Sequence, residues 1–267
     1  MQPRPARSGS LLPGVEGLRF DAVTTAGMVT WPDEDRQRLR RELERLFCDA
    51  FPRMPAGEIL DWVEDYFKIP ATGFQRRAFL LWKGPCRLAA TTLFEEGKLE
   101  HQGGLLKGIY IIGRAVAPEY HNSGAGRRIA TKILAEFQPD ILMTTCTQSA
   151  SLYSWIAVAC RSFPEDYEVF PRLENGIPIT LPLQDREFAL NAFRRLYLSV
   201  VNGDLDQVAR SVAGLTVSMV RKGMYAERYD FSPWEKAGRN DALARALGTG
   251  PGDGILLVIP RKGRMRS

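Results

Sequence analysis

Histidine is scarce in this chain of 267 residues, which contains only His101 and His121. Neither histidine lies in an HExxH sequence or in a Cys/His cluster, so a zinc site is poorly supported. The same shortage argues against a Ser-His-Asp catalytic triad. We therefore expect no metal ion in the chemistry of this protein.

Paired cysteines and long apolar runs are also missing. The four cysteines lie far apart without CxxC spacing, which is typical of thiols in a reducing compartment. No apolar run approaches the ~18 residues that a membrane span needs. The N-terminal residues include arginines but no apolar segment of a secretory signal. The expected location is therefore cytoplasmic.

The remaining composition is that of an ordinary globular protein, with 45% hydrophobic and 25% charged residues. Residues 1–17 are rich in proline and show little periodicity, so we expect a flexible lead-in, followed by a single domain over residues 18–267. The net charge of +5 suits a phosphate-bearing coenzyme or an acidic carrier protein. Because the arginines are spread along the chain, a nucleic-acid partner is not favoured.

The most informative stretch covers residues 109–137. An apolar, β-branched run from Ile109 predicts a buried strand, which Pro118 ends because proline cannot donate to a sheet. Two glycines follow, and apolar residues then recur at helical spacing. These residues are Ile129, Ile133, Leu134 and Phe137. The order is a strand, a glycine-rich turn and a helix.

This arrangement predicts a phosphate site. Gly124 and Gly126 allow the backbone to approach a ligand closely, and the first helical turn presents free N–H groups with partial positive charge. Arg127 adds a positive charge. The third position of a GxGxxG dinucleotide pattern is Ile129, and GxxxxGK[ST] is missing, so neither of those patterns applies. The alternative is that the glycines only make a tight connection.

The residues of this turn resemble the coenzyme A signature of the GNAT-type N-acyltransferases, V-x-P-x-Y followed by [QR]-x-x-G-x-[GA]. The sequence reads Val116-Ala117-Pro118-Glu119-Tyr120 and then His121-Asn122-Ser123-Gly124-Ala125-Gly126. His121 stands where the family usually has Gln or Arg. The resemblance implies an α+β (α/β) fold: a mixed, mostly antiparallel sheet whose central parallel strands splay apart, flanked by helices. It also implies acetyl-CoA, or another acyl-CoA, as co-substrate.

The resemblance also implies site residues. Main-chain groups of Arg114, Ala115 and Val116 would pair with the pantetheine arm. The pyrophosphate would be held by Asn122, Ser123, Gly124, Ala125, Gly126 and Arg127.

A tyrosine on the helix after the next strand is the expected general acid. The GNAT family motif at this place is N-x-x-A-x-x-L-Y. The chain matches the last two positions of the motif with Leu152-Tyr153, and Cys146 stands at the Asn position. A phenol within hydrogen-bond reach can protonate the departing thiolate. The alternatives are that Tyr153 is a packing residue, or that Cys146 carries the acyl group, although a buried inert thiol is the default for that cysteine. A general base could lie on the loop before the central strand, as His101 or Glu100, although a solvated loop histidine is the more common case. No carboxylate is marked as the base by its position, so the base is unassigned.

Outside this stretch the pattern predicts further elements. Two N-terminal helices are expected, from Thr30 and over 58–67, and the resemblance implies that they flank the acceptor groove. Strands are expected at 77–82, 86–94, 141–146 and 254–260, with the charged run 95–98 ending the second strand and a flexible loop at 101–104. A helical insertion at about 184–252 precedes the last strand. It would cover the acceptor site with Tyr225, Tyr229, Phe231 and Trp234, or else form a dimer surface or extra core.

The expected function is therefore transfer of an acetyl or longer acyl group from coenzyme A to an amine by direct attack on the thioester. Two alternatives stay open: a non-catalytic GNAT-like module that binds a coenzyme or partner, and an enzyme like the N-acyl amino acid synthases that uses a long acyl chain. The acceptor would be a small-molecule or peptide amine. A membrane partner is not expected, and a homodimer is not excluded.

Overall fold

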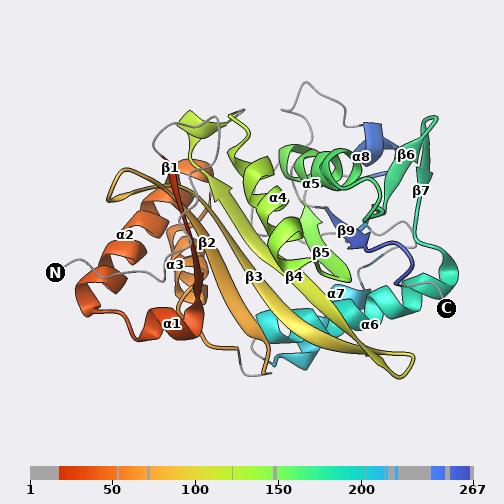
Figure 1. The fold of residues 1–267 in the computed structure, drawn as a ribbon, viewed down its shortest axis with the longest axis horizontal. Helices are drawn as coiled ribbons and strands as arrows, with labels where there is room; N and C mark the ends of the chain where they lie inside the picture. Colours follow the sequence, from red (N-terminus) through yellow and green to blue (C-terminus); the bar gives the residue numbers. More distant parts are fainter. Residues whose placement is uncertain are drawn as a thin grey trace.

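The computed structural model describes residues 18–52, 54–70, 73–121, 123–146, 149–201, 203–213, 215, 220–221, 242–249 and 253–264. Its centre is a seven-stranded sheet with strand order β1-β2-β3-β4-β5-β9-β8 (Figure 1). The strands are β1 (Leu18–Thr24), β2 (Gln75–Lys83), β3 (Arg87–His101), β4 (Gly104–Val116), β5 (Ile141–Cys146), β8 (Val220–Arg221) and β9 (Gly254–Pro260). Neighbouring strands pair antiparallel except β4 and β5, which are parallel. The predicted mixed, mostly antiparallel sheet is confirmed.

Helices cover both faces of this sheet. They are α1 (Thr25–Val29), α2 (Asp33–Ala50), α3 (Ala56–Asp65), α4 (Ala125–Phe137), α5 (Ser149–Ser162), α6 (Leu183–Val200), α7 (Leu205–Ala213) and α8 (Ala242–Ala246). A short 3₁₀ turn, η1 (Pro118–Tyr120), lies between β4 and α4. A separate hairpin is formed by β6 (Arg172–Glu174) and β7 (Ile177–Ile179). In the described part of the chain, no helix has the length and apolarity to cross a membrane.

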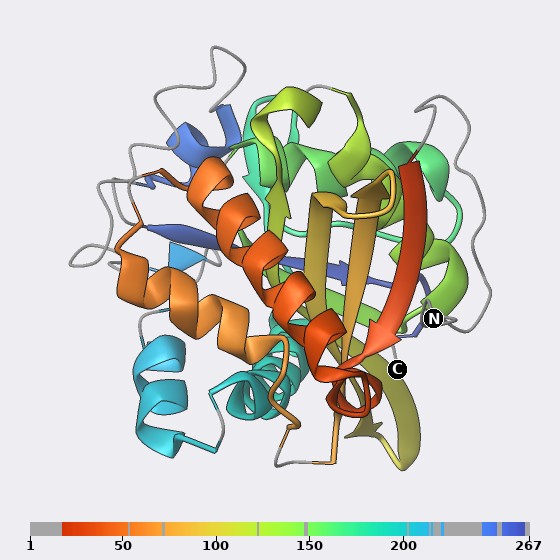
Figure 2. The same cartoon turned by 90° about the vertical axis from the view of Figure 1, so that its left-hand side faces the viewer.

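The alternation of side chains along the strands decides which helix covers which face. In β2, Phe79 and Leu81 pack in one hydrophobic cluster with residues of α4 and α5, whereas Leu80 and Trp82 pack in another with residues of α2 and α3. Figure 2 shows α2 crossing that second face. The part of this face formed by β4, β5 and β9 is covered by α6, through a third cluster that includes Phe193.

The two parallel strands separate before β4 ends. Pairing between β4 and β5 runs from Gly108 with Ile141 to Ile111 with Thr144 and stops there. Against β3, Leu93 pairs with Gly113 and Phe94 with Ile111, so Ile112 is the extra residue of a β-bulge. A bulge bends its strand and increases the local twist. The last residues of β4 therefore diverge from β5, as the resemblance implied.

The prediction that β3 ends at residues 95–98 is wrong. This strand continues to His101 and forms a long hairpin with β4, whose turn residues Gln102 and Gly103 have φ values of 48° and 76°. The two glutamates fit within the sheet because each has a partner: Glu95 pairs with Arg76, and Glu96 with Arg77. The expected flexible loop at 101–104 is therefore a tight turn.

The first part of the predicted insertion belongs to the core. Along α6, the residues that face the sheet are buried, and Phe193 has no exposed surface. For this helix, the alternative of extra core is the correct one. The aromatic residues proposed to cover the acceptor site, Tyr225 to Trp234, lie outside the described residues, as does the lead-in 1–17.

Candidate functional site

The connection from β4 to α4 is a series of tight turns. After β4 ends at Val116, the N–H of Tyr120 donates to the Ala117 carbonyl (2.8 Å), and the N–H of Ser123 donates to the Tyr120 carbonyl (3.2 Å). Gly124 then adopts φ 85° and ψ 5° as the N-cap of α4. This left-handed conformation is one that glycine adopts without steric cost, so the glycine sets the direction in which the helix begins.

The first turn of α4 presents backbone N–H groups that are not capped by the Gly124 side of the helix. No side chain caps it at Gly124, and the first helical N–H that bonds back to the cap is that of Arg128, to the Gly124 carbonyl (3.0 Å). The N–H of Ala125 is satisfied by the Ser123 hydroxyl (3.2 Å). Within the described residues, the N–H groups of Gly126 and Arg127 have no acceptor, and such groups are the donors that a helix start presents to an anion. The exposed side chain of Arg127 adds a positive charge beside them.

Beneath this loop, the end of β4 has one neighbouring strand. Thr92, Thr91 and Ala90 of β3 pair with Arg114, Ala115 and Val116, and β5 has already separated. The edge of β4 that faces β5 is therefore where an extended ligand could pair with main-chain groups. One of these groups has a partner, because the Nε2 atom of His121 lies 3.0 Å from the Val116 carbonyl oxygen.

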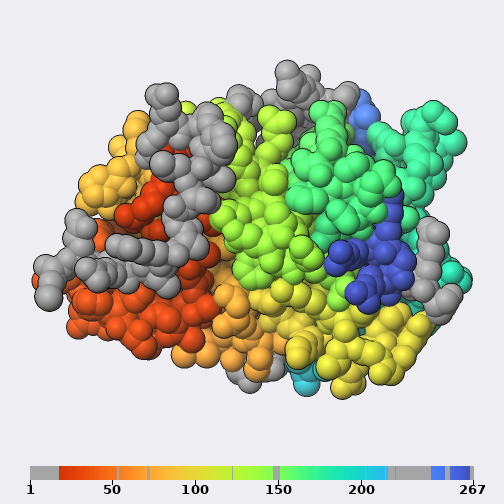
Figure 3. All heavy atoms as spheres, viewed as in Figure 1, coloured from red at the N-terminus to blue at the C-terminus, as the bar shows by residue number. Residues whose placement is uncertain are grey.

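The side chain of Arg114 fills the space between the first turns of α4 and α5, helices that lie side by side in Figure 3. Its Nη1 donates to the Gly126 carbonyl (3.2 Å), and its Nη2 donates to the Ser151 carbonyl (3.3 Å). The same Nη2 donates to the hydroxyls of Ser151 (3.1 Å) and Ser154 (2.6 Å). The guanidinium also lies over the Trp155 ring, 5.6 Å from its centroid. Desolvation lowers the pKa of Arg114 to about 10, which leaves the group charged at neutral pH.

The remaining candidates lie on β5 and α5. Cys146 ends β5 and is buried, and burial raises the pKa of its thiol to about 11. Such a thiol is protonated at neutral pH and is a poor nucleophile, which favours the inert-thiol interpretation. Tyr153 is half-buried on α5, one residue before Ser154, which contacts Arg114. Asn122 lies outside the described residues.

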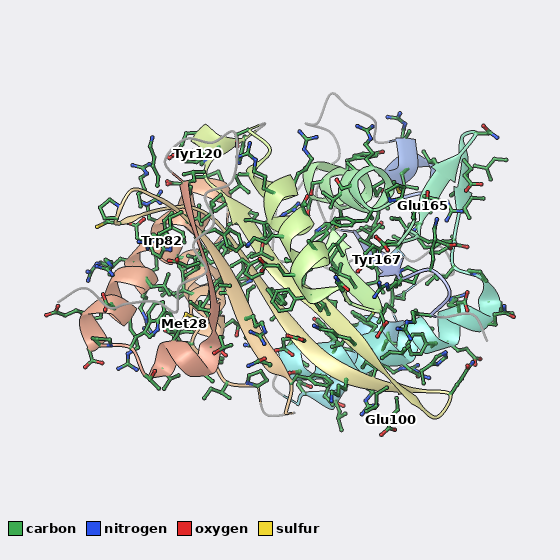
Figure 4. All side chains as sticks on the ribbon, in the orientation of Figure 1. Met28, Trp82, Glu100, Tyr120, Glu165 and Tyr167 are labelled. Carbon is green, nitrogen blue, oxygen red and sulfur yellow. The ribbon has the colours of Figure 1, made fainter. Side chains whose placement is uncertain are left out.

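Neither residue considered as a base on the β3–β4 connection lies near this site. Figure 4 shows Glu100 at the hairpin end of the sheet and Tyr120 at the opposite end. His101 pairs with Gly104, eight residues before the bulge at Ile112, a separation of roughly 26 Å along a strand. Both suggestions are therefore wrong, because the predicted loop is the far turn of a long hairpin.

Two cavities lie away from the connection between β4 and α4. One, of about 470 Å³, lies between α2 and the end of α3 and is lined by residues such as Arg36, Arg40 and Phe67. The other, of about 290 Å³, lies between the β3–β4 hairpin and α6, beside His101 and Phe188. Among the residues that the structure describes, no cluster of histidine, cysteine and carboxylate side chains could hold a metal ion.

Comparison with known proteins gives likenesses of fold only. No family model matches the chain, and no curated protein matches its sequence. An aminoglycoside 6'-N-acetyltransferase from Acinetobacter baumannii is 12% identical over 54% of this chain and 90% of its own, with a TM-score of 0.34. A protein from Corynebacterium glutamicum described as histone acetyltransferase HPA2 and related acetyltransferase is 9% identical. The match covers 60% of this chain and 90% of that protein, with a TM-score of 0.37. A probable N-acyltransferase from Enterococcus faecalis is 14% identical over 56% of this chain and 33% of its own, with a TM-score of 0.33.

The topology itself defines the class of fold. A mostly antiparallel sheet with one parallel pair, β4 and β5, that separates beside a glycine-started helix is a GNAT-type fold. The sequence predicted this fold and the order of strand, glycine turn and helix, but it did not predict that the Arg114 side chain contacts both α4 and α5. The available signal was a charged residue that follows an apolar strand run and lies directly before Ala115 and Val116.

Proposed function

We propose that this protein is an N-acyltransferase that takes an acetyl or longer acyl group from coenzyme A. The observation that carries the proposal is the conjunction of two features at one end of the sheet. The edge of β4 loses its parallel partner after Ile111, and α4 begins beside that edge at Gly124 with open N–H groups. The open edge suits an extended pantetheine arm, and the helix start suits a pyrophosphate. An acyl-CoA is a ligand that needs both.

The residues of the site fit that ligand. Main-chain groups of Arg114, Ala115 and Val116 would pair with the pantetheine arm, and His121 would release the Val116 carbonyl on binding. The segment 122–127 would hold the pyrophosphate. The fit rests on the left-handed Gly124, on the free N–H groups and on the positive charges around them.

In the chemistry that we propose, the bound acyl-CoA supplies an acyl group activated as a thioester. The chain would hold this group beside the acceptor amine, because proximity supplies much of the rate gain in such a transfer. A backbone N–H near Val116 would donate to the carbonyl oxygen as negative charge develops on it. The Tyr153 hydroxyl would give its proton to the departing sulfur. The proton that the amine loses would pass to water, since no side chain is assigned as the base.

A non-catalytic coenzyme-binding module is the second candidate. It is favoured by the Arg114 guanidinium, which connects the first turns of α4 and α5 across the space where the coenzyme would lie. Turnover separates the two candidates: both predict coenzyme binding, and only the enzyme releases free coenzyme A when an amine is present. The acceptor would be a small-molecule or peptide amine.

Thermal unfolding with added ligand tests the coenzyme site first. Acetyl-CoA, a longer acyl-CoA and dephospho-CoA would each be added at about 100 times the dissociation constant, which stabilises the folded state by ~2.7 kcal/mol. A shift of a few degrees in Tm with acetyl-CoA would support the proposal. A larger shift with the longer chain would favour the long-chain enzyme. If none of the three ligands changes Tm, the coenzyme assignment is wrong.

Replacement of Tyr153 by Phe tests the enzymatic step. Removing a general acid costs on the order of 10²–10⁴ in turnover, while coenzyme binding should persist because the ring is retained. The measurement is thiol release from acetyl-CoA in the presence of an amine panel, together with the dissociation constant of coenzyme A. Unchanged turnover in Tyr153→Phe would identify Tyr153 as a packing residue.

A further inference from the structure

The Arg114 guanidinium is a desolvated charge whose partners are all neutral. Its hydrogen bonds go to two carbonyl oxygens and two serine hydroxyls, and its flat face lies over Trp155. Among the described residues, no carboxylate lies within ion-pair distance of it. The Cys146 thiol interacts electrostatically with it, and that thiol is protonated at neutral pH because burial raises its pKa to about 11.

An uncompensated charge of this kind is unfavourable in the ligand-free protein. Removing a guanidinium from water is costly unless an opposite charge accompanies it, and neutral acceptors recover only part of the lost hydration. Arginine is also always protonated at physiological pH, so the group cannot escape the cost by losing its proton. The surroundings of Arg114 therefore favour the entry of an anion.

The position of this charge indicates where the anion would lie. The guanidinium is against the first turn of α4: a side chain built on Gly126 would meet the Arg114 guanidinium carbon at 3.5 Å. Nη1 bonds the carbonyl of the same residue whose N–H faces the open end of the helix. A planar fork of donors is well matched to phosphate oxygens. The guanidinium therefore lies beside the first turn of α4, the turn that presents its N–H groups to an anion.

We propose that the Arg114 side chain, and not only its main chain, is the counter-charge for a phosphate group of the bound coenzyme. This inference rests on the proposed function, which supplies the phosphate ligand. On binding, the guanidinium exchanges neutral acceptors on α5 for a phosphate oxygen and releases the connection between α4 and α5. Arg114 is a binding residue that selects the phosphorylated coenzyme over its phosphate-free fragment.

The test compares two ligands that share the pantetheine arm. Coenzyme A and pantetheine would be titrated by calorimetry into the wild-type chain, Arg114→Met and Arg114→Lys. Arg114→Met should weaken coenzyme A binding about 10- to 100-fold, the value of charge-assisted hydrogen bonds, and leave pantetheine binding unchanged. Arg114→Lys keeps the charge but lacks the planar pair of donors, so its affinity for coenzyme A should lie between those of the wild-type chain and Arg114→Met.

A matched variant controls for the loss of net charge. Arg161 is exposed in the last turn of α5, and Arg161→Met should not change either affinity. Equal coenzyme A affinities in Arg114→Met and Arg161→Met would overturn the inference and leave the proposed function standing. If Arg114 only connected the two helices, Arg114→Met would lower the urea midpoint and weaken both ligands alike.

Inorganic pyrophosphate separates this inference from the proposed function. If the wild-type chain binds no coenzyme A but binds pyrophosphate in a manner that Arg114→Met abolishes, the acyltransferase proposal fails and Arg114 is still an anion-binding residue. If neither ligand binds, both proposals are wrong.

Discussion

At the scale of single residues, the two glycines of the phosphate loop have different physical roles. Gly124 has φ 85°, a conformation that costs an ordinary L-residue roughly 1–2 kcal/mol. Gly126 is inside the helix, and a Cβ there would make an ordinary contact at 3.5 Å with the Arg114 guanidinium. The first glycine is required by the backbone conformation, whereas the space around the second would accept a Cβ.

This difference predicts that one alanine substitution lowers the stability of the protein and that the other leaves it nearly unchanged. Gly124→Ala should destabilise the protein by roughly 1–2 kcal/mol and weaken coenzyme binding, because the start of α4 would have to turn. Gly126→Ala should change stability by no more than about 0.5 kcal/mol, since nothing must move. Urea unfolding of both variants is the measurement. Equal losses in the two would show that space, and not the dihedral angle, sets the requirement.

The buried thiol of Cys146 gives a prediction about pH. Its raised pKa means that the fold favours the protonated form, so this contribution to stability is present below about pH 8.5, the ordinary thiol value, and is lost as pH rises through about 11. At pH 8 alkylation of Cys146 should be slow and should accelerate about tenfold per pH unit up to about pH 11, because the thiolate is the reactive form. Mass spectrometry of iodoacetamide-labelled peptides measures this rate. The exposed Cys48 and Cys86 are internal controls, and labelling of Cys146 at their rate would contradict its burial.

At the scale of elements, the sequence predicted those features whose signals are local. The apolar run 109–112 within β4, the glycines and the helical period of α4 lie within one stretch of about thirty residues, so strand, turn and helix could be inferred together. The end of β3 could not, because Glu95 looks like a strand-ending charge until Arg76, far away in sequence, is known to face it. The contacts of the Arg114 side chain could not be predicted for the same reason, since its partners on α5 are tertiary contacts.

The helix α6 could be predicted from the spacing of its apolar residues, but the surface against which it packs could not. An amphipathic helix fits a lid over the acceptor site as well as it fits a core element. In the structure, the Phe193 ring lies 5.8 Å from Tyr110 on the central strand and 5.1 Å from Tyr197, between ring centroids. This helix therefore supports the strand on which the candidate site is built.

A core role for α6 predicts a large effect of Phe193→Ala on stability. Removing a fully buried ring should cost about 3–5 kcal/mol. Leu183→Ala, on the same helix with a side chain that is 79% exposed, should change stability by less than about 0.5 kcal/mol. Chemical denaturation of both variants is the measurement. A lid helix would show the reverse, with little loss of stability in Phe193→Ala and an altered KM for the acceptor.

At the scale of the whole molecule, one face of the sheet is divided between two groups of helices. The cluster under α2 and α3 and the cluster under α6 and α7 share this face. Arg76 links them, because its guanidinium donates to the carbonyls of Asp65 at the end of α3 (3.1 Å) and Ser199 on α6 (3.3 Å). Its charge is met by Glu95, and neither side chain has any exposed surface.

We predict that replacing one member of this ion pair destabilises the fold strongly, whereas replacing both members together destabilises it much less. Glu95→Leu alone should cost about 3–5 kcal/mol, because the buried Arg76 charge would lose its close partner and keep the Asp65 carboxylate at 3.8 Å. Combining it with Arg76→Met should recover most of that loss, since the desolvation cost of both charges disappears, although the two carbonyls lose a donor. Urea unfolding of the two single variants and the double variant gives the coupling energy. A double variant as unstable as the sum of the singles would show that the links to α3 and α6, and not the paired charges, hold the two halves of this face together.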